Sequence, residues 1–262
     1  MRCDIHTHAF HPKIASKVLA QLNEHYGIKP VGQGTVEDLL ARAKAANLDT
    51  VVIHSAATDA AQVVPANNFA IELQKTYDMV RAFGTVHPDY PDMPAELDRL
   101  AARGITGLKV HCDFQGFRMD DPRLYDIVEM AANRFVFMFH VGDALPPAEN
   151  PSCPLKFARL RATFPDTPMI AAHFGGYRHW EHALLHLIGS PAYIDTSSTL
   201  DFVSDDLLHE LYSRHPRERI LFGSDYPLYD PATEAEKLAR RLHLADSELD
   251  SLLDNAGRLL TH

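Results

Sequence analysis

Eight short apolar runs recur at regular intervals along the chain, and each run ends in a polar side chain. Continuous apolar runs of this length are typical of parallel strands that are buried on both faces. The polar residues at their ends are, in chain order, His8, His54, His87, Lys109, His140, His173, Asp195 and Asp225. They lie about 31 residues apart on average, which is the length of one strand–helix–strand step. The chain is therefore predicted to repeat one strand and one helix eight times.

The predicted strands cover residues 2–6, 50–55, 82–87, 107–111, 135–141, 169–174, 192–196 and 220–224. Helical periodicity fills most intervals between them and predicts helices at residues 39–46, 96–102, 123–132, 155–163, 180–188, 205–212, 232–242 and 247–260. Thr35, which is followed by two acidic residues, is a predicted N-cap for the first of these helices. The first interval is the longest, so we expect an inserted helix at residues 13–25 within a segment at about 11–34.

Strands that alternate with helices form a parallel sheet with right-handed crossovers. A doubly wound open sheet is one such architecture, but eight nearly even steps in 262 residues favour a closed (β/α)8 TIM barrel. Hydrophobic residues make up 46% of the chain and charged residues 23%, which is the balance of a globular protein with a large core. We therefore predict an α/β fold with a single barrel domain over residues 1–262.

Composition also limits the classes of partner. The formal net charge is −10, whereas nucleic-acid binding requires a basic face. The three cysteines, Cys3, Cys112 and Cys153, are far apart, which argues against a disulfide framework or a cysteine zinc site. No stretch has the roughly 18 apolar residues of a membrane helix, and the first residues lack signal-peptide character. We therefore expect a cytoplasmic protein without nucleic-acid or membrane partners, and we leave open whether it forms a homodimer.

The first strand carries two histidines two residues apart, His6 and His8, which follow Asp4. Residues at positions i and i+2 of a strand point to the same side, so both imidazoles are expected to face the barrel interior. Two such imidazoles can bind one metal ion, and the Asp4 carboxylate could orient one of them through a hydrogen bond. Taken alone, the pair is explained as simply by two polar residues at a strand end.

Three other strand ends favour the metal site over this simpler explanation. His140 follows the apolar residues 135–139, His173 follows residues 169–172, and Asp225 follows residues 220–224. The carboxyl ends of all the strands of a barrel converge on one mouth, where the active sites of this fold lie. A metal site that contains these residues explains the pattern better than coincidence does.

With their flanking residues, these positions resemble the amidohydrolase superfamily. Within it, the chain resembles the amidohydrolase-related (amidohydrolase 2) branch, which includes aminocarboxymuconate-semialdehyde-decarboxylase-like enzymes. The stretches that carry the resemblance are Asp4-Ile5-His6-Thr7-His8, Gly107-Leu108-Lys109-Val110-His111, Gln115-Gly116-Phe117, Phe139-His140, Ala172-His173-Phe174-Gly175-Gly176, Gly223-Ser224-Asp225-Tyr226-Pro227 and Asn255-Ala256-Gly257-Arg258-Leu259-Leu260. They cover essentially the whole chain. In one of them Val141 follows His140 where threonine is usual, which leaves the ligand itself unchanged.

The resemblance implies a TIM barrel of the metal-dependent hydrolase type, with His6, His8, His140 and Asp225 as its metal ligands. It gives catalytic roles to His173 and to Asp225. Lys109 stands where members with two metals carry a bridging lysine. It is therefore a candidate second-metal ligand or a cation that faces the substrate.

Three further residues are candidates for substrate binding. His111 shares a strand face with Lys109. Arg118 and Arg178 follow the fourth and sixth strands and could clamp a substrate carboxylate, although loop arginines are commonly solvated. His54 either lines the mouth of the barrel or caps a loop carbonyl, and the same alternatives apply to His87.

Imidazole and carboxylate donors suit one divalent ion, with Zn²⁺ as the default and Mn²⁺, Fe²⁺ or Co²⁺ as alternatives. The main hypothesis is hydrolysis, in which metal-activated water attacks an amide, lactone or ester of a small carboxylated substrate. Asp225 would accept the water proton, and His173 would stabilise the oxyanion. The alternative is a non-oxidative decarboxylase of a small unsaturated or aromatic acid, which uses the same residues. A non-catalytic metal-binding barrel is the weaker alternative.

Overall fold

The computed structural model describes residues 1–260. Its centre is a parallel sheet of strands in sequence order: β1 (Cys3–Thr7), β2 (Thr50–Ile53), β3 (Val80–Thr85), β4 (Gly107–Val110), β5 (Val136–Phe139), β6 (Met169–Ala171), β7 (Tyr193–Asp195) and β8 (Ile220–Leu221). The segment after β8 returns to β1, where the amide of Ile5 donates to the Phe222 carbonyl and that of Asp225 to the His6 carbonyl, both at 2.9 Å. These bonds close the sheet into the predicted TIM barrel.

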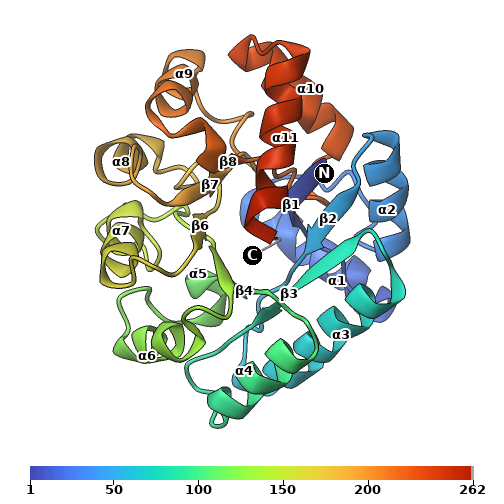
Figure 1. Ribbon diagram of the computed structural model, residues 1–262, viewed down its shortest axis with the longest axis vertical. Helices are drawn as coiled ribbons and strands as arrows, with labels where there is room; N and C mark the ends of the chain where they lie inside the picture. Colours follow the sequence, from blue (N-terminus) through green and yellow to red (C-terminus); the bar gives the residue numbers. More distant parts are fainter. Residues whose placement is uncertain (261–262) are drawn as a thin grey trace.

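Helices surround the barrel on its outer side (Figure 1). They are α1 (Pro12–Tyr26), α2 (Val36–Ala45), α3 (Val63–Thr76), α4 (Met93–Ala102), α5 (Cys112–Gln115), α6 (Pro122–Ala131), α7 (Pro154–Thr163), α8 (Trp180–His186), α9 (Asp205–Arg214), α10 (Pro231–Leu242) and α11 (Asp246–Leu260), with short 3₁₀ helices at Ala60–Gln62 and Arg217–Arg219. All eight predicted strands are present, and Thr35 caps α2 by accepting from the amide of Asp38.

Two helices, α3 and α5, were not predicted from the sequence. The first turn of α3 contains Pro65, and its middle contains Asn67 and Asn68, which are weak helix formers. Tertiary contacts stabilise it instead, since buried Asn67 accepts from the amide of Thr85 at 2.7 Å and donates to its carbonyl at 3.1 Å. The helix α5 has only four residues, too few to show a periodic pattern.

The buried apolar residues form two clusters. The smaller cluster joins side chains of several strands, among them Ile5, Phe83 and Met138, to Ala256 and Leu259 of α11. Figure 1 shows α11 crossing one end of the barrel, near both termini. The larger cluster lies between the sheet and the surrounding helices. The barrel is therefore a packed core that is closed at one end, as the fold requires.

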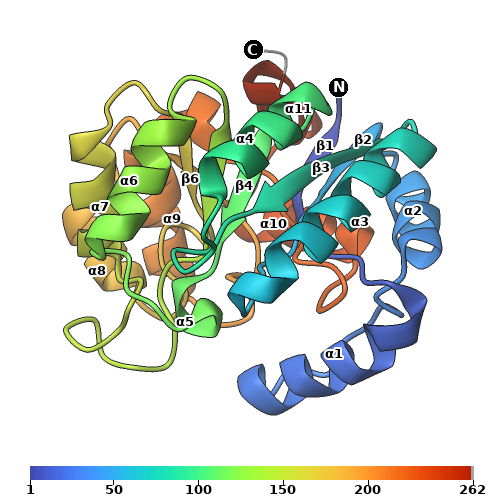
Figure 2. The same cartoon turned by 90° about the horizontal axis from the view of Figure 1, so that it is seen from below.

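The inserted segment between β1 and β2 forms α1, which covers the helix predicted at residues 13–25. It ends at Gly27, whose φ of 68° is the left-handed conformation that glycine adopts readily at a helix C-terminus. Figure 2 shows α1 projecting from the body of the barrel below α3. Most of its residues are exposed, so it is held to the barrel by few apolar contacts.

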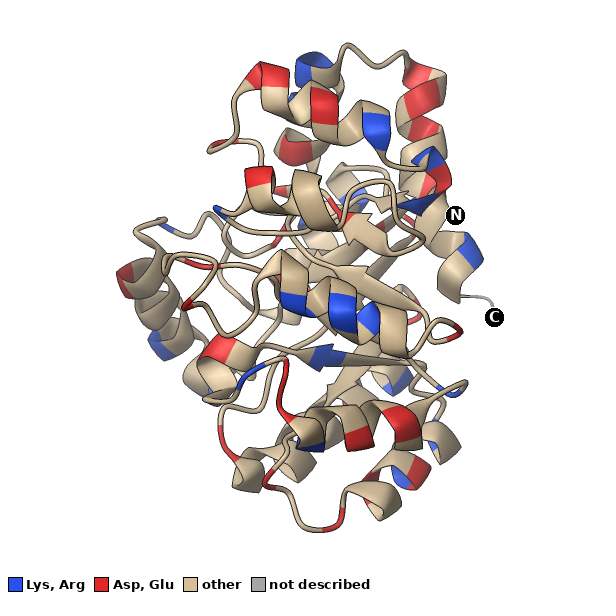
Figure 3. Cartoon of the chain, turned by 90° about the vertical axis from the view of Figure 1, so that its left-hand side faces the viewer, with Lys and Arg blue, Asp and Glu red and all other residues tan. Residues whose placement is uncertain are grey.

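Positions of basic and acidic residues are interspersed along the outer helices in the view of Figure 3. Among residues 1–260, no helix combines the length and apolar character that a membrane span requires.

Candidate metal and substrate site

A cavity of about 1160 Å³ opens at the carboxyl ends of the strands. Seven of the nine predicted site residues line it: His6, His8, Lys109, His111, His140, His173 and Asp225. Much of the remaining wall comes from the inserted segment and from α3. Most of its surface is apolar, with Ile14, Val18 and Leu22 on α1 and Phe69 on α3, although Lys17, Gln21 and Glu24 of α1 also line it. The cavity therefore joins a polar floor to an apolar outer half.

His6 lies at the centre of the polar floor. Its Nδ1 is 2.8 Å from Oδ2 of Asp195 at the end of β7, and its Nε2 is 3.5 Å from Oδ1 of Asp225. Burial lowers the pKa of His6 to about 4, so the ring is neutral at pH 7. With Nδ1–H donated to Asp195, the lone pair of Nε2 faces Asp225, which is the tautomer that a metal ligand needs.

His8 has the same arrangement. Its Nδ1 donates to the His54 carbonyl at 2.7 Å, and its Nε2 is 3.1 Å from Asp225 Oδ1. Ligand atoms bound to one tetrahedral Zn²⁺ at about 2.0–2.1 Å are about 3.4 Å from one another. The spacing of Asp225 Oδ1 from the two Nε2 atoms therefore fits a shared ion.

The Asp225 backbone adopts a left-handed conformation with φ 62°, which is uncommon outside glycine and is typical of functional sites. Ser198 Oγ donates a hydrogen bond to its Oδ2. Burial opposes ionisation, but the surrounding imidazoles of His6, His8 and His173 hold the pKa of Asp225 well below its usual range. The carboxylate is therefore ionised and is suited to a cation.

His140 and His173 are in direct contact, with 2.9 Å between Nδ1 of His140 and Nε2 of His173. The Nδ1 of His173 reaches the carbonyl of Ser197 at 3.2 Å, which makes it the donor of that bond. His173 Nε2 then accepts from His140 Nδ1–H, which leaves the buried Nε2 of His140 without a partner among the described residues. An unpaired buried lone pair of this kind is satisfied by an ion or a water molecule.

Three groups of His and Asp side chains in the described part of the chain have ligand atoms within 4.8 Å of one another. The first is His6, His8 and His54, the second is His6, His173 and Asp195, and the third is His111, Asp113 and His140. The predicted ligands are therefore split between neighbouring groups. His140 stacks on His111 at 3.8 Å between ring centroids, whereas His6, His8 and Asp225 converge directly.

Lys109 is the buried cation of the site. Its Nζ lies 3.4 Å from Nε2 of His6, and no carboxylate of residues 1–260 forms an ion pair with it. Burial lowers the pKa of Lys109 to about 8, although Asp195 and Asp225 raise it in part. Its position agrees with either predicted role, a second-metal ligand or a cation that faces the substrate.

Neither predicted arginine clamp reaches the cavity. Arg118 is half-exposed and pairs with Asp120 at 3.0 Å, because α5 turns the chain outward after β4. Arg178 is exposed and lies over the rings of Tyr177 and Phe202 at 5.4 and 5.5 Å. The cations and imidazoles that do line the cavity belong to the strand ends and to α1.

Sequence reasoning also assigned the wrong carboxylate to orient the histidines. Asp4 Oδ1 accepts from the backbone amides of His6 and Ser224, whereas Asp195 binds the His6 ring. The register of β1 against β2 shifts between Asp4 and Thr7, so strict alternation does not hold across this segment. Asp195 could have been found, because it ends an apolar run as the other site residues do.

Tyr26 could not have been found from the sequence. It comes from the end of α1, and its hydroxyl is 3.3 Å from Nε2 of His111. The preceding His25 is 3.1 Å from Asp143 Oδ2, in the loop after β5. These contacts tie the inserted helix to the wall of the site, and they depend on a fold-back that no local pattern encodes.

Sequence comparisons with known proteins give two findings. A family model described as amidohydrolase (Amidohydro_2) matches residues 3–261. No curated protein matches the chain.

Many solved structures are similar. The 5-carboxyvanillate decarboxylase from Sphingomonas paucimobilis has a TM-score of 0.74 at 14% identity, covering 99% of this chain and 98% of that one. A dihydroxybenzoic acid decarboxylase from Polaromonas, with bound manganese and 2-nitroresorcinol, has a TM-score of 0.70 at 15% identity, covering 99% and 96%. A probable 2-pyrone-4,6-dicarboxylic acid hydrolase from Acinetobacter baumannii, with bound citric acid, has a TM-score of 0.71 at 15% identity, covering 100% of both chains.

Proposed function

Because the chain belongs to the amidohydrolase family, we propose that it is a metal-dependent enzyme that removes CO₂ from an unsaturated or aromatic acid without an oxidant. The observation that carries this proposal is the convergence of His6 and His8 on Asp225, beside buried Lys109, at the floor of a cavity with apolar walls. Two of the structural neighbours described above are decarboxylases of aromatic acids, which supports decarboxylation over the hydrolysis expected from the sequence.

His6, His8 and Asp225 would hold one divalent ion, with His140 as the further ligand. The ion, when bound, supplies positive charge that fixes an oxygen of the substrate. Imidazole and carboxylate donors suit Zn²⁺, and manganese is the ion bound in the Polaromonas enzyme. Asp195 and the His54 carbonyl keep the two Nε2 lone pairs turned toward the ion.

Decarboxylation breaks the bond between the carboxylate carbon and the substrate body, and the electron pair stays on the body. A proton must then replace the departing CO₂. His173 lines the cavity, so we assign it the delivery of that proton, which its Nε2 takes up from solvent in exchange for the hydrogen bond with His140. Lys109 attracts the negatively charged substrate into the site.

The size of the cavity argues for more than a single-ring acid. Ligand cavities typically measure about 300–1,000 Å³ for drug-sized molecules, and this one reaches about 1160 Å³. The carboxylated end of the substrate lies on the polar floor, and an apolar extension lies between α1 and α3. Ile14, Val18 and Phe69 would contact that extension.

Lactone hydrolysis is the second candidate, because the Acinetobacter hydrolase matches this chain over its full length. In that reaction, Asp225 accepts the proton of the attacking water and His173 stabilises the oxyanion. A single preparation, loaded with Zn²⁺ or Mn²⁺, separates the two reactions.

The test measures CO₂ release from 2,6-dihydroxybenzoate, 5-carboxyvanillate and their alkylated derivatives, and ring opening of 2-pyrone-4,6-dicarboxylate. We expect CO₂ release that is lost in metal-free protein and in Asp225→Asn. Ring opening without CO₂ release would make the protein a hydrolase. If the protein binds no divalent ion and neither reaction occurs across the panel, the proposal is wrong.

A further inference from the structure

His54, at the end of β2, is a buried imidazole whose two ring nitrogens both lack a hydrogen-bond partner among the described residues. Its side chain is 1% exposed. Buried polar atoms are almost always paired, because an unpaired one loses its hydrogen bonds to water and gains none in return. An imidazole with two free nitrogens in such a place therefore points to a partner that the protein chain does not supply.

Other histidines near the site provide the contrast. His87, which ends the next strand, is also buried, but its Nδ1 accepts from the amide of Asp89 and its Nε2 lies 3.2 Å from the Gln115 carbonyl. That ring caps a loop, which is one of the two roles expected from the sequence. The ring nitrogens of His54 have no such contact. Only its backbone is hydrogen-bonded, with the amide donating to the Thr7 carbonyl and the carbonyl accepting from His8.

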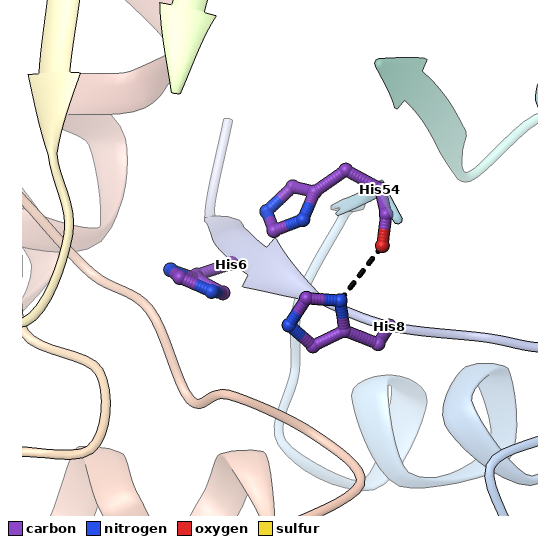
Figure 4. A group of neighbouring side chains, drawn as sticks. All are labelled: His6, His8 and His54. Atoms are coloured by element: carbon purple, nitrogen blue, oxygen red, sulfur yellow. Dashed lines mark hydrogen bonds between the residues drawn. The ribbon is translucent and has the colours of Figure 1, made fainter. Parts of the chain in front are cut away.

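The free ring lies against the two histidines of β1. Its centroid is 4.6 Å from that of His6 and 4.7 Å from that of His8. Figure 4 shows the three rings around a common space, and one ring nitrogen from each lies within 4.8 Å of the others. The Nδ1 atoms of His6 and His8 are engaged elsewhere, which leaves both Nε2 lone pairs for an ion, that of His6 within 3.4 Å of Lys109 Nζ.

We propose that His54 is a further ligand of the ion held by His6 and His8, so that the site presents three imidazole nitrogens on one side. This inference rests on the proposed function only in placing an ion at these residues. Three nitrogen donors favour Zn²⁺ or Co²⁺ over Mn²⁺, since imidazole suits the borderline ions and oxygen donors suit manganese. His54 would therefore set the metal preference of this protein.

The first test compares His54→Gln with His87→Gln, the matched buried strand-end histidine. Dissociation constants for Zn²⁺ and Mn²⁺ are measured by chelator competition on metal-free proteins that retain the wild-type circular dichroism spectrum. We expect His54→Gln to weaken Zn²⁺ binding at least tenfold and Mn²⁺ binding less, which narrows the Zn²⁺/Mn²⁺ affinity ratio. His87→Gln should leave that ratio unchanged.

A lost affinity alone would also follow from misplaced neighbours, so the ligand count is measured directly. X-ray absorption of the zinc-loaded protein should show one imidazole fewer in His54→Gln than in the wild type. In His54→Cys loaded with Co²⁺, a thiolate-to-cobalt charge-transfer band should appear in the near ultraviolet, whereas the wild type should lack it. This second variant keeps the test decisive if His54→Gln does not fold.

An unchanged imidazole count with no charge-transfer band would overturn the role of His54 and leave the proposed function intact. That result would assign His54 to packing against the faces of the neighbouring rings. A wild-type protein that binds neither Zn²⁺ nor Mn²⁺ would overturn the proposed function as well. The two failures are therefore distinguishable without any activity measurement.

Discussion

At the scale of single residues, the role of each histidine in this site depends on which of its ring nitrogens has no hydrogen-bond partner in the protein. His6 and His8 donate Nδ1–H to Asp195 and to the His54 carbonyl, and they turn Nε2 toward Asp225. His173 instead uses both nitrogens within the protein. A histidine side chain can therefore serve as a metal ligand or as a proton carrier, and its hydrogen-bond partners decide which.

That difference separates His140 from His173. His140→Ala should lower metal occupancy, with activity partly recovered at high metal concentration. His173→Asn should retain the ion but lose about 10²–10⁴-fold in kcat, the contribution of positioned acid–base chemistry. Metal analysis and kcat are measured on the same samples. If His173→Asn strips the metal as fully as His140→Ala does, His173 is a ligand.

A second residue-scale prediction concerns pH and stability. Buried His215 accepts from the amide of Gly189 and lies 3.0 Å from the Ala192 carbonyl, and burial lowers its pKa to about 4. The unfolded chain, with a histidine pKa of about 6.5, binds the proton more readily between these values. The contribution of His215 to stability is therefore complete above pH 6.5 and is lost as the pH falls toward 4.

The free energy of unfolding is measured by urea denaturation at pH 7 and pH 4.5. When the pH is lowered from 7 to 4.5, the free energy of unfolding should fall less in His215→Gln than in the wild type. The difference between the two decreases should be up to about 3 kcal/mol. The exposed His243→Asn serves as the control and should follow the wild type. Equal pH slopes in all three proteins would contradict the prediction.

At the scale of elements, α1 is the part of the fold that distinguishes the cavity. Its apolar row faces the space in front of α3, while its last residues contact the wall of the site through Tyr26 and His25. The helix is therefore anchored to the barrel at its C-terminal end, while the rest of its length borders the cavity. We assign it the recognition of the apolar part of the substrate.

Val18→Asp places a charge on the cavity face of α1, and Ala20→Asp places one on an exposed position of the same helix that does not line the cavity. Each buried methylene contributes about 0.8 kcal/mol. Val18→Asp should therefore raise KM for 4-hexyl-2,6-dihydroxybenzoate at least tenfold and leave KM for 2,6-dihydroxybenzoate within about twofold. Ala20→Asp should change neither. If Val18→Asp changes KM equally for both substrates, α1 does not recognise the apolar part of the substrate.

At the scale of the whole molecule, the ion is expected to hold the mouth of the barrel together. Its proposed ligands come from β1, β2, β5 and the segment after β8, so binding joins elements that are far apart in sequence. An ion that binds only the folded chain stabilises it in proportion to the logarithm of its concentration.

Removal of metal should therefore lower the thermal stability. At a Zn²⁺ concentration about 100 times the dissociation constant, the gain is about 2.7 kcal/mol, which should raise Tm by roughly 5 °C or more. Differential scanning calorimetry with and without Zn²⁺ measures this shift. The double variant His6→Ala/His8→Ala should show no shift, and an equal shift in that variant would place the ion elsewhere.

The sequence by itself determined the barrel and the set of residues at its mouth. Eight apolar runs with even spacing favour a closed parallel sheet over an open one, and the polar residue that ends each run then lies at the same end of the barrel. His6, His8, Lys109, His140, His173 and Asp225 were identified in this way, and all of them line the cavity.

Only the tertiary structure decided how these residues are paired. The pairing of His6 with Asp195 instead of Asp4 joins β1 to the end of β7, and the outward turn of Arg118 follows the short helix α5. Hydrogen bonds between side chains that are 189 residues apart, as for His6 and Asp195, have no local pattern. Periodicity reports which face of an element is buried, whereas the partner of a buried polar atom is fixed by the packing of the whole molecule.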